Sequence, residues 1–393
     1  MDPTRERTDT HDATRHSSRL RDLALTSAFA LFLLLPAIAA VTGIGEDTDL
    51  IEQRVLADRP GGPTDFEEWK AYPDRFESFF EDHFGLRKWL IYTHKKVLRK
   101  VWKKGRDDVL YGKGDWLYYS GFGILGDYRR TDPFRRSDLE TWNAIASSAC
   151  AQSKELGYAL LWAVAPNKFS VYPEYAPAGI QPTGPVGRLD QFLDYFEEHS
   201  CLDILDLRPA LETAKKDNLA YWSSDTHWTE VGAVFGLEAI LRRIQSHVPE
   251  TRVLSLEDFS VEEIEVMGGD LAKMLGMQED YRETVPSAKL RAPARAKQIE
   301  QPAWCDALSP IERDQVLVFE TGDENLPDAV VFHDSFGLAL RDFLAECFRR
   351  VVFITTRQYR MDWVPHEKPD VVIRLFVERR LSERTPEGKR RGS

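Results

Sequence analysis

Apolar and polar positions alternate in blocks along most of the chain, and from about residue 107 the blocks switch regularly between two periods. The longer blocks place apolar side chains three and four positions apart, which is the pattern of an amphipathic helix. The shorter blocks are nearly continuous apolar runs, which predict buried strands. This alternation favours an α/β domain with a mostly parallel sheet and helices on both of its faces.

The elements can be placed by residue number. The predicted helices are 136–156, 187–198, 208–217, 228–246 and 336–348. The predicted buried strands are 158–164, 202–207, 329–332, 351–355 and 371–375, and 115–120 is expected to form an edge strand or hairpin. Segment 247–328 fits neither period well, because its part 286–310 is rich in proline and charge. We interpret it as a long, partly irregular insertion.

The longest uncharged segment lies near the N-terminus, between Leu23 and Val41. A helix needs about 20 apolar residues to cross a bilayer, so 22–43 is predicted to be a transmembrane signal anchor. Arginines precede this segment and acidic residues follow it, which predicts a cytoplasmic N-terminus and an exported body. The alternative is a cleavable signal peptide, because Ala37-Ile38-Ala39-Ala40 resembles a cleavage site. We expect the body to lie in the bacterial periplasm, attached to the inner membrane.

The remaining divisions follow from composition. Residues 1–21 form a polar tail, 44–106 a helical lead-in, 107–381 the main α/β domain and 382–393 a polar tail that we expect to be disordered. Basic residues recur between Lys95 and Arg106. They fit a solvated helix face, or a contact with anionic headgroups or an anionic polymer.

Charge and cysteine usage narrow the class of protein further. The net charge of −12 argues against a nucleic-acid partner, whose binding would require a basic surface. Four cysteines in an exported chain permit disulfides. Cys150 and Cys201 can meet at one end of the sheet, with Cys305 and Cys347 as the other pair. Three pairings are possible, and four free thiols are equally compatible with the sequence.

Two motifs carry candidate chemistry. Asp225-Thr226-His227-Trp228 precedes a predicted helix, and Asp334-Ser335-Phe336-Gly337 follows a predicted strand. A serine hydroxyl needs a base to take its proton and a third group to orient that base. Asp225 and His227 can supply both, and Ser335 at a strand-to-helix turn can supply the nucleophile. The backbone N–H of Ser335 or Phe336 would then help to hold a developing oxyanion.

Each motif also has a purely structural interpretation. Ser335 and Asp225 can act as helix N-caps, and His227 can be a surface histidine. The occurrence of both motifs in one exported α/β chain favours the catalytic interpretation. No metal site is expected, because His227 and His333 lack the paired spacing of zinc motifs, and no cofactor is expected either.

The chain resembles the alginate O-acetyltransferase family, the AlgJ- and AlgX-like proteins with an SGNH-hydrolase-like domain. The resemblance rests on Asp225-Thr226-His227-Trp228 followed by Gly232, and on Asp334-Ser335-Phe336. Supporting matches are Asp82-His83-Phe84-Gly85-Leu86-Arg87, Trp116-Leu117-Tyr118-Tyr119, Ala165-Pro166-Asn167-Lys168, Tyr172-Pro173-Glu174, Gly269-Asp270-Leu271, Lys368-Pro369-Asp370-Val371-Val372 and Glu378-Arg379. It implies a three-layer α/β/α sandwich of the SGNH-hydrolase type.

The resemblance also implies roles. Ser335 would be the nucleophile, His227 the base and Asp225 the partner of His227. The reaction would be periplasmic transfer of acetyl groups to an exopolysaccharide, with a multi-pass membrane acyltransferase as donor partner. The family commonly has glycine directly before Asp-Ser-Phe, whereas this chain has His333. That side chain would narrow the approach to Ser335 or offer a second imidazole.

Three further residues are candidates for the same site. Asn167 and Lys168 follow a predicted strand and can reach the rim that holds Ser335, where an amide would complete an oxyanion hole or brace a loop. Trp228, with Tyr221 and Trp222, can stack on sugar rings or belong to the core. Two other functions remain open: a carbohydrate esterase with the same triad, and a catalytically silent scaffold of an export complex.

Overall fold

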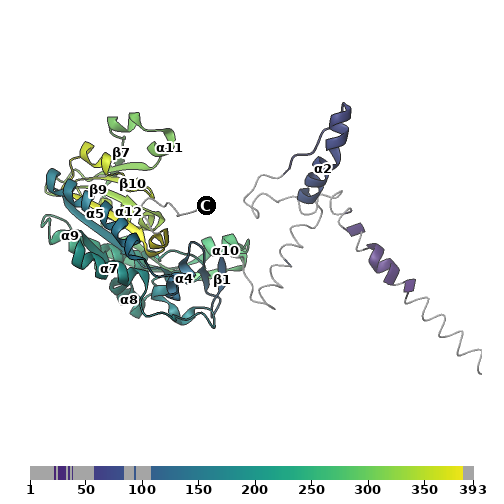
Figure 1. The fold of residues 1–393 in the computed structure, drawn as a ribbon, viewed down its shortest axis with the longest axis horizontal. Helices are drawn as coiled ribbons and strands as arrows, with labels where there is room; N and C mark the ends of the chain where they lie inside the picture. The colour runs from purple at the N-terminus through teal and green to yellow at the C-terminus, as the bar shows by residue number, and fades with distance from the viewer. Residues whose placement is uncertain are drawn as a thin grey trace, which may run out of the picture. The chain divides into compact units, whose positions relative to one another are not determined.

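A computed structural model of the protein describes residues 22–23, 25–31, 34–35, 38, 57–83, 93 and 108–383. The chain divides into two compact units, Met1–Lys103 and Lys104–Ser393. The first unit contains α2 (Phe66–His83), which falls in the predicted helical lead-in. The second unit contains the sheet and the candidate site (Figure 1).

A seven-stranded sheet forms the centre of the second unit, in the order β4-β3-β11-β9-β10-β8-β7. The strands β4, β3, β11, β9 and β10 run parallel to their neighbours, and β8 and β7 complete the sheet as antiparallel additions. In chain order the strands are β3 (Ala159–Ala165), β4 (Asp203–Asp206), β7 (Lys297–Ile299), β8 (Val316–Glu320), β9 (Asp328–His333), β10 (Arg350–Thr355) and β11 (Val371–Val377). The predicted mostly parallel sheet is confirmed.

Helices cover both faces of this sheet, because successive side chains of a strand point to opposite sides. On β3, Leu161 and Ala163 join the core on the side of α8 and α9, whereas Trp162 and Val164 join the core on the side of α5 and α7. The helices are α4 (Ile124–Tyr128), α5 (Arg136–Leu156), α6 (Lys168–Val171), α7 (Arg188–His199), α8 (Arg208–Asp217), α9 (Glu230–Gln245), α10 (Asp270–Met274), α11 (Pro310–Arg313) and α12 (Arg341–Ala345). The result is the predicted α/β/α arrangement.

Two departures from the predicted helices and loops have clear causes. The single helix expected at 336–348 is instead a short 3₁₀ turn, η6 (Ser335–Ala339), followed by α12. Gly337 packs so closely on the end of β9 that a Cβ there would lie 2.4 Å from Cγ of His333. The turn that presents Ser335 is therefore held by its contact with the sheet and not by the geometry of a regular helix.

The segment 247–328 is more regular than its composition predicts. It contains a long antiparallel hairpin, β5 (Phe259–Met267) with β6 (Arg282–Leu290), and it supplies β7 and β8 to the main sheet. Pro286 lies inside β6, and a proline within an apolar run argues against a central strand. Because β6 pairs only with β5, the strand tolerates it. Glu230 of α9 anchors this hairpin by accepting hydrogen bonds from Ser287 and Ala288.

A small hairpin, β1 (Val109–Tyr111) with β2 (Leu117–Tyr119), matches the edge element predicted at 115–120. A disulfide joins Cys150, late in α5, to Cys201, just before β4, while Cys305 and Cys347 are buried free thiols. This settles the pairing that the sequence left open.

The ends of the chain are described only in part. Of the predicted anchor 22–43, residues 22–23, 25–31, 34–35 and 38 are described and helical. Within the described residues, none of the helices combines the length and apolar character that a membrane crossing requires. Ser382 and Glu383 still belong to η8 (Glu378–Glu383), where Ser382 accepts a hydrogen bond from Arg188. The predicted disorder therefore does not begin at 382. The rest of that tail, residues 1–21 and the basic residues between 95 and 106 lie outside the described residues.

Candidate active site

Ser335, His227 and Asp225 form a continuous hydrogen-bonded chain. Nε2 of His227 lies 2.9 Å from the Ser335 hydroxyl oxygen, and Nδ1 of His227 lies 2.7 Å from Oδ1 of Asp225. With Nδ1 donating to the carboxylate, Nε2 is left with a lone pair that accepts the serine proton. Ser335 is exposed, and the His227 side chain is 29% exposed, so a substrate can reach the pair. The geometry is that of an activated nucleophile.

The nucleophile sits at the end of β9, on a turn tied down by Asp334. Oδ1 of Asp334 accepts a hydrogen bond of 3.0 Å from the N–H of Phe336, and Oδ2 accepts one of 2.8 Å from Val377 at the end of β11. The indole of Trp228 donates to the carbonyl of Phe336 at 3.2 Å. The Ser335 turn is thereby joined both to the neighbouring strand and to the loop that carries His227.

The base comes from a loop closed by its own backbone. Tyr221 and Trp228 form an isolated antiparallel bridge, so Asp225 and His227 lie in the loop between them. Directly afterwards, Thr229 caps α9 by accepting a hydrogen bond from Gly232. Gly232 is required there, because a Cβ would lie 2.2 Å from the carbonyl oxygen of Ala220. This close approach explains the glycine that follows the motif.

Burial and hydrogen bonding act in opposite directions on Asp225. Desolvation alone would raise the pKa of its carboxyl, but hydrogen bonds from His227 and from the Asp270 N–H outweigh burial and lower the pKa to about 2. Asp225 is therefore ionised near neutral pH. An ionised partner keeps the imidazole in the tautomer that accepts a proton at Nε2, and it stabilises the imidazolium that forms.

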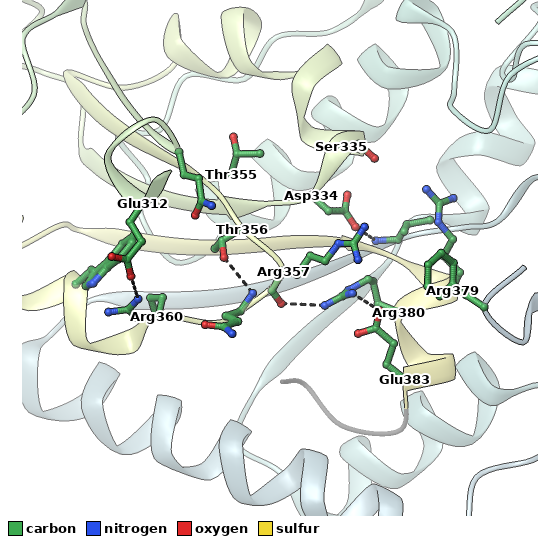
Figure 2. Close-up of a pocket in the computed structure, with 15 residues that line it drawn as sticks. Glu312, Asp334, Ser335, Thr355, Thr356, Arg357, Arg360, Arg379, Arg380 and Glu383 are labelled. Atoms are coloured by element: carbon green, nitrogen blue, oxygen red, sulfur yellow. Dashed lines mark hydrogen bonds and ion pairs between the residues drawn. The ribbon is translucent and has the colours of Figure 1, made fainter. Parts of the chain in front are cut away.

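A cleft of about 560 Å³ opens beside Ser335, at the carboxyl ends of β9, β10 and β11. Ligands of open α/β sheets bind at this edge of the strands. Figure 2 shows four arginines in the cleft, with Arg357, Arg379 and Arg380 on the side of Ser335 and Arg360 beside Glu312. Arg360 pairs with Glu312 and Asp362, and Arg380 pairs with Glu383. Among the described residues, no carboxylate lies within ion-pair distance of the Arg357 or Arg379 side chain.

Asn167 and Lys168 do not line this cleft. Both are buried beside a small hollow of about 10 Å³ that also touches Thr226 and Arg379. The N–H of Asn167 donates to Glu378 at 2.7 Å, and its side chain makes no cap hydrogen bond to α6. Asn167 therefore braces the end of β11 through its backbone, and the proposed oxyanion role finds no support in its position.

Lys168 acts behind the site. Its ammonium donates to the carbonyls of Leu117 and Ser223, at 2.9 and 3.0 Å, and so ties β2 to the loop of His227. Burial lowers the pKa of Lys168 to about 7, against the opposing effect of the charges of Asp225, Asp270 and Glu283. Its contacts are with the frame of the loop, so it is not a substrate ligand.

The structure decides between the two interpretations that the sequence left open for Trp228 and Tyr221, and it narrows the choice of backbone oxyanion donor. Trp228 and Tyr221 are 2% and 0% exposed, so their rings belong to the core and cannot stack on a sugar. Trp228 instead packs edge-on against Phe336 at 5.2 Å. The N–H of Phe336 is already engaged by Asp334, so of the two predicted oxyanion donors only the Ser335 N–H remains a candidate.

His333 is fixed in the interior. It is 1% exposed, its Nδ1 lies 2.8 Å from the carbonyl oxygen of Asp334, and its Nε2 lies 3.3 Å from the Thr355 hydroxyl. Burial lowers the pKa of His333. The ring fills space below the Ser335 turn and does not narrow the approach to the hydroxyl.

Within the described residues, one cluster has the composition of a metal site: Asp225, His227 and Asp270, whose candidate ligand atoms lie within 4.8 Å of one another. These atoms already have partners. Nδ1 of His227 must carry a proton to donate to Asp225, and a protonated nitrogen has no lone pair for a metal. The cluster therefore fits a proton-transfer site, and we assign no metal to it.

The sequence also missed residues that shape the site. Asp270 lies beside His227, with Oδ2 3.6 Å from Nδ1, yet the sequence offered it only as part of a weak supporting match. Arg357 and Arg379 line the cleft from the segments that follow β10 and β11, and Arg379 was named only within the supporting match Glu378-Arg379. The signal for them was the cluster of arginines that follows the two last apolar strands.

Comparisons with known proteins bear on the family and the fold of the chain. A sequence profile of the family described as "SGNH hydrolase-like domain, acetyltransferase AlgX" matches residues 109–310. The probable alginate O-acetylase AlgJ of Pseudomonas aeruginosa is 24% identical over 215 residues, which cover 54% of this chain and 52% of that protein. The chain thus spans about half the length of the curated relatives it matches.

A solved structure shows the same fold. PatB1 of Bacillus cereus superimposes with a TM-score of 0.54 at 15% identity, covering 72% of this chain and 99% of PatB1. A second structure of PatB1, with a sulfonyl adduct, gives a TM-score of 0.51 at 14% identity, covering 70% and 95% of the two chains. At this level of identity the likeness concerns the fold alone.

Proposed function

The chain belongs to the family of SGNH hydrolase-like domains described as acetyltransferase AlgX, and on that premise we propose that it is an O-acetyltransferase acting on an exopolysaccharide. The reaction proceeds through an acetyl-Ser335 intermediate. The observation that carries the proposal is the unbroken chain of hydrogen bonds from exposed Ser335 through His227 to Asp225, at 2.9 and 2.7 Å.

In the first half-reaction the Ser335 oxygen attacks the carbonyl carbon of an acetyl ester. Nε2 of His227 takes the hydroxyl proton and passes it to the departing alcohol of the donor, while the acetyl group stays on the serine. Asp225, ionised and bonded to Nδ1, stabilises the imidazolium while it exists. The N–H of Ser335 at the start of η6 supports the oxyanion.

In the second half-reaction a sugar hydroxyl replaces the donor. His227 takes the proton of the sugar hydroxyl, and the sugar oxygen attacks the carbonyl carbon of the acetyl group. The Ser335 oxygen then leaves and takes a proton back from His227. Arg357 and Arg379 line the cleft with no carboxylate partner among the described residues, so they fit an acceptor that carries acidic groups. The AlgJ relatives are named as probable alginate O-acetylases, which agrees with a polysaccharide acceptor.

The acetyl donor and the cellular location complete the proposal. A multi-pass membrane acyltransferase would deliver acetyl groups to a catalytic domain in the periplasm. The segment 22–43 would anchor the chain in the inner membrane. We expect the full-length protein to fractionate with membranes and to keep its N-terminus. Mass spectrometry that found a mature chain beginning near residue 41 would replace the anchor by a cleaved signal peptide.

An esterase is the second candidate, because Ser335 is exposed and water can reach an acetyl group on it. The two functions share the first half-reaction and differ in the second acceptor. A silent scaffold would carry out neither half-reaction. The three functions therefore differ in the fate of the donor's acetyl group, which is transferred to a sugar, released as acetate or left on the donor.

The test uses the full-length protein in detergent with a chromogenic acetyl ester, in the presence and absence of anionic and neutral oligosaccharides. We expect an acetyl group on Ser335 by mass spectrometry and its transfer to an oligosaccharide hydroxyl, with Ser335→Ala inactive in both steps. Release of free acetate only, unchanged by every acceptor, would identify an esterase. An unlabelled Ser335 with no turnover would leave the scaffold as the function.

A further inference from the structure

A second carboxylate stands beside the imidazole of His227. Asp270 begins α10, and its Oδ2 lies 3.6 Å from Nδ1 of His227, where Oδ1 of Asp225 lies at 2.7 Å. The nitrogen that must carry a proton during the reaction therefore faces two negative groups, supplied by segments 45 residues apart in sequence. The reaction described above uses only the first of them.

The two segments hold each other reciprocally. Oδ2 of Asp225 accepts a hydrogen bond of 2.7 Å from the N–H of Asp270, and Oδ1 of Asp270 accepts one of 2.7 Å from the N–H of Thr226. The Thr226 hydroxyl donates to Oδ2 of Asp270. The N–H of Gly269 donates to the Ser224 hydroxyl at 2.8 Å. Each carboxylate thus fixes the backbone that carries the other.

Gly269 allows the two segments to come this close. A Cβ at position 269 would lie 2.3 Å from Oδ2 of Asp225 and 2.4 Å from its Cβ. No side chain fits at that distance, so only glycine lets α10 begin against Asp225. Asp270 is therefore placed beside His227 by close packing of two backbones, which is a more rigid placement than a surface contact.

The imidazole of His227 has charged, titratable and aromatic neighbours. Asp225 and Asp270 face Nδ1, and Ser335 faces Nε2. The ring of Phe336 packs 4.9 Å from the imidazole, with the Arg379 guanidinium 5.2 Å from the centre of that ring. Lys168 and Glu283 lie behind the loop and bind Ser223. Three polar groups lie near Nδ1: Oδ1 of Asp225 at 2.7 Å, the Thr226 hydroxyl at 3.3 Å and Oδ2 of Asp270 at 3.6 Å. Of these, only the two aspartates can carry a negative charge.

We propose that Asp270 is a positioning residue that shares the orientation of His227 with Asp225 and takes the place of Asp225 at Nδ1 when that carboxylate is absent. The proposal rests on the proposed acetyl transfer and extends its catalytic chain from three residues to four. Truncation of Asp225 would free the space between the segments. A shift of about 1 Å then brings Oδ2 of Asp270 to an ordinary hydrogen-bond distance from Nδ1.

A double-mutant cycle tests this directly. The rate of acetylation of Ser335 by a chromogenic ester is measured for the wild type, Asp225→Ala, Asp270→Asn and the double variant. We expect about a hundredfold loss for Asp225→Ala and about tenfold for Asp270→Asn, mainly in kcat. The double variant should lose at least about tenfold more than the product of the single losses, which is about ten-thousandfold relative to the wild type. Losses that multiply to within about threefold would overturn the proposal.

The pH profile separates positioning from a structural role. A carboxylate that acts through its charge and one that only braces the backbone should affect the pH dependence of the rate differently, because only the first places a negative charge beside Nδ1, at 3.6 Å. Removing that charge in Asp270→Asn should therefore move the acid limb of the acetylation profile to lower pH. Thr226→Val removes the hydroxyl that donates to Asp270 and lies 3.3 Å from Nδ1 of His227, but it keeps the charge of Asp270, so its limb should stay in place. An unmoved limb in Asp270→Asn would contradict the proposal.

Glu283→Gln is the matched structural control. Glu283 braces the same loop through Ser223 and Ser224, and its removal should lower thermal stability and the maximal rate without moving the acid limb. Asp270→Glu retains the charge and should recover part of the rate if Asp270→Asn misfolds. Ser335→Ala is run in parallel. Acetylation in that variant would overturn the proposed function itself, whereas failure of the cycle alone removes only the role of Asp270.

Discussion

At the scale of single residues, the proposed activity depends on the transfer of the Ser335 hydroxyl proton to His227. Ser335 has an accessible hydroxyl, but the neutral form of a serine is a weak nucleophile. In the proposed mechanism His227 is the base, and Asp225, with its pKa lowered to about 2, orients that base and compensates its charge. The contributions of the three residues are therefore unequal, and they do not add.

Alanine substitutions should rank these residues. Ser335→Ala removes the atom that forms the intermediate, and His227→Ala removes the base, so each should lower kcat by about a thousandfold or more. Asp225→Ala should be milder, because His227 still bonds Ser335 and Asp270 remains nearby. The measurement is steady-state ester hydrolysis and acetyl transfer by each purified variant, with folding checked by circular dichroism. Full activity of Ser335→Ala would exclude the covalent mechanism.

His333→Gly restores the residue that is usual in the family. The ring is buried and bonds the Thr355 hydroxyl and the Asp334 carbonyl, so its removal leaves a cavity that should destabilise the fold by about 3 kcal/mol or more. Activity at low temperature should stay within about tenfold, or about 1.4 kcal/mol of barrier, because the ring does not touch the reacting atoms.

His333→Gln, which fills more of the space, is the matched control. Thermal unfolding and ester turnover are measured for both variants at the same temperature. A collapse of activity in both, with the fold intact, would show that this imidazole takes part in the reaction.

At the scale of elements, the site depends on how strands and loops are fastened together. Asp334 joins the Ser335 turn to the end of β11, and Lys168 joins β2 to the His227 loop. Glu230 anchors the β5–β6 hairpin on α9. These contacts fix the relative positions of segments that are distant in sequence. The first two hold the segments that carry Ser335 and His227, whose reacting atoms lie 2.9 Å apart.

The disulfide offers a direct test of one such fastening. Cys150 and Cys201 close a loop with a sequence separation of 51 between the end of α5 and the start of β4. Closing a loop of this length is worth about 4 kcal/mol through the entropy of the unfolded chain. We expect a reductant to lower the melting temperature of the wild type by several degrees, and Cys150→Ser with Cys201→Ser to match the reduced protein.

The double serine variant should not respond to the reductant. Cys305 and Cys347 stay in place as the control, because both are buried free thiols. An equal response of the wild type and the variant would mean that the reductant acts elsewhere.

At the scale of the whole molecule, a buried carboxyl group links the free energy of unfolding to pH. Glu378, at the end of β11, is buried and accepts hydrogen bonds from Asn167 and Ser170. Burial, with the nearby charge of Asp127, raises the pKa of Glu378 to about 7. Between its unfolded value and pH 7 the folded protein binds more protons than the unfolded chain, so this carboxyl makes the protein less stable as pH rises through that window.

Glu378→Gln should remove that dependence. The amide keeps an oxygen acceptor for Asn167 and Ser170 but cannot ionise. The wild type should therefore lose up to about 3 kcal/mol more than the variant between pH 4.5 and pH 8. Denaturant unfolding of both proteins at the two pH values measures the difference in slope, and parallel pH curves would refute the assignment.

The sequence by itself determined the local elements and the three candidate catalytic side chains. Periodicity located α5 and α8 at their observed limits and placed β9, β10 and β11 within a few residues, because an amphipathic or fully buried segment records its own environment in its pattern. The motifs pointed to Ser335, His227 and Asp225 as candidates because few residue types can activate a hydroxyl, and the structure brings these three side chains together. The confirmed family resemblance and the mostly parallel sheet rest on the same local information.

Only the tertiary structure decided which groups surround Ser335, His227 and Asp225. Trp228 and Tyr221 proved to be core, Asn167 and Lys168 proved to brace the frame, and Asp270 proved to lie beside His227. The β5–β6 hairpin was hidden by Pro286, and the 336–348 helix was broken at the Ser335 turn. Each of these outcomes depends on contact between segments far apart in the chain, where the close approach at Gly269 or the packing of Gly337 on His333 leaves no periodic trace in the sequence.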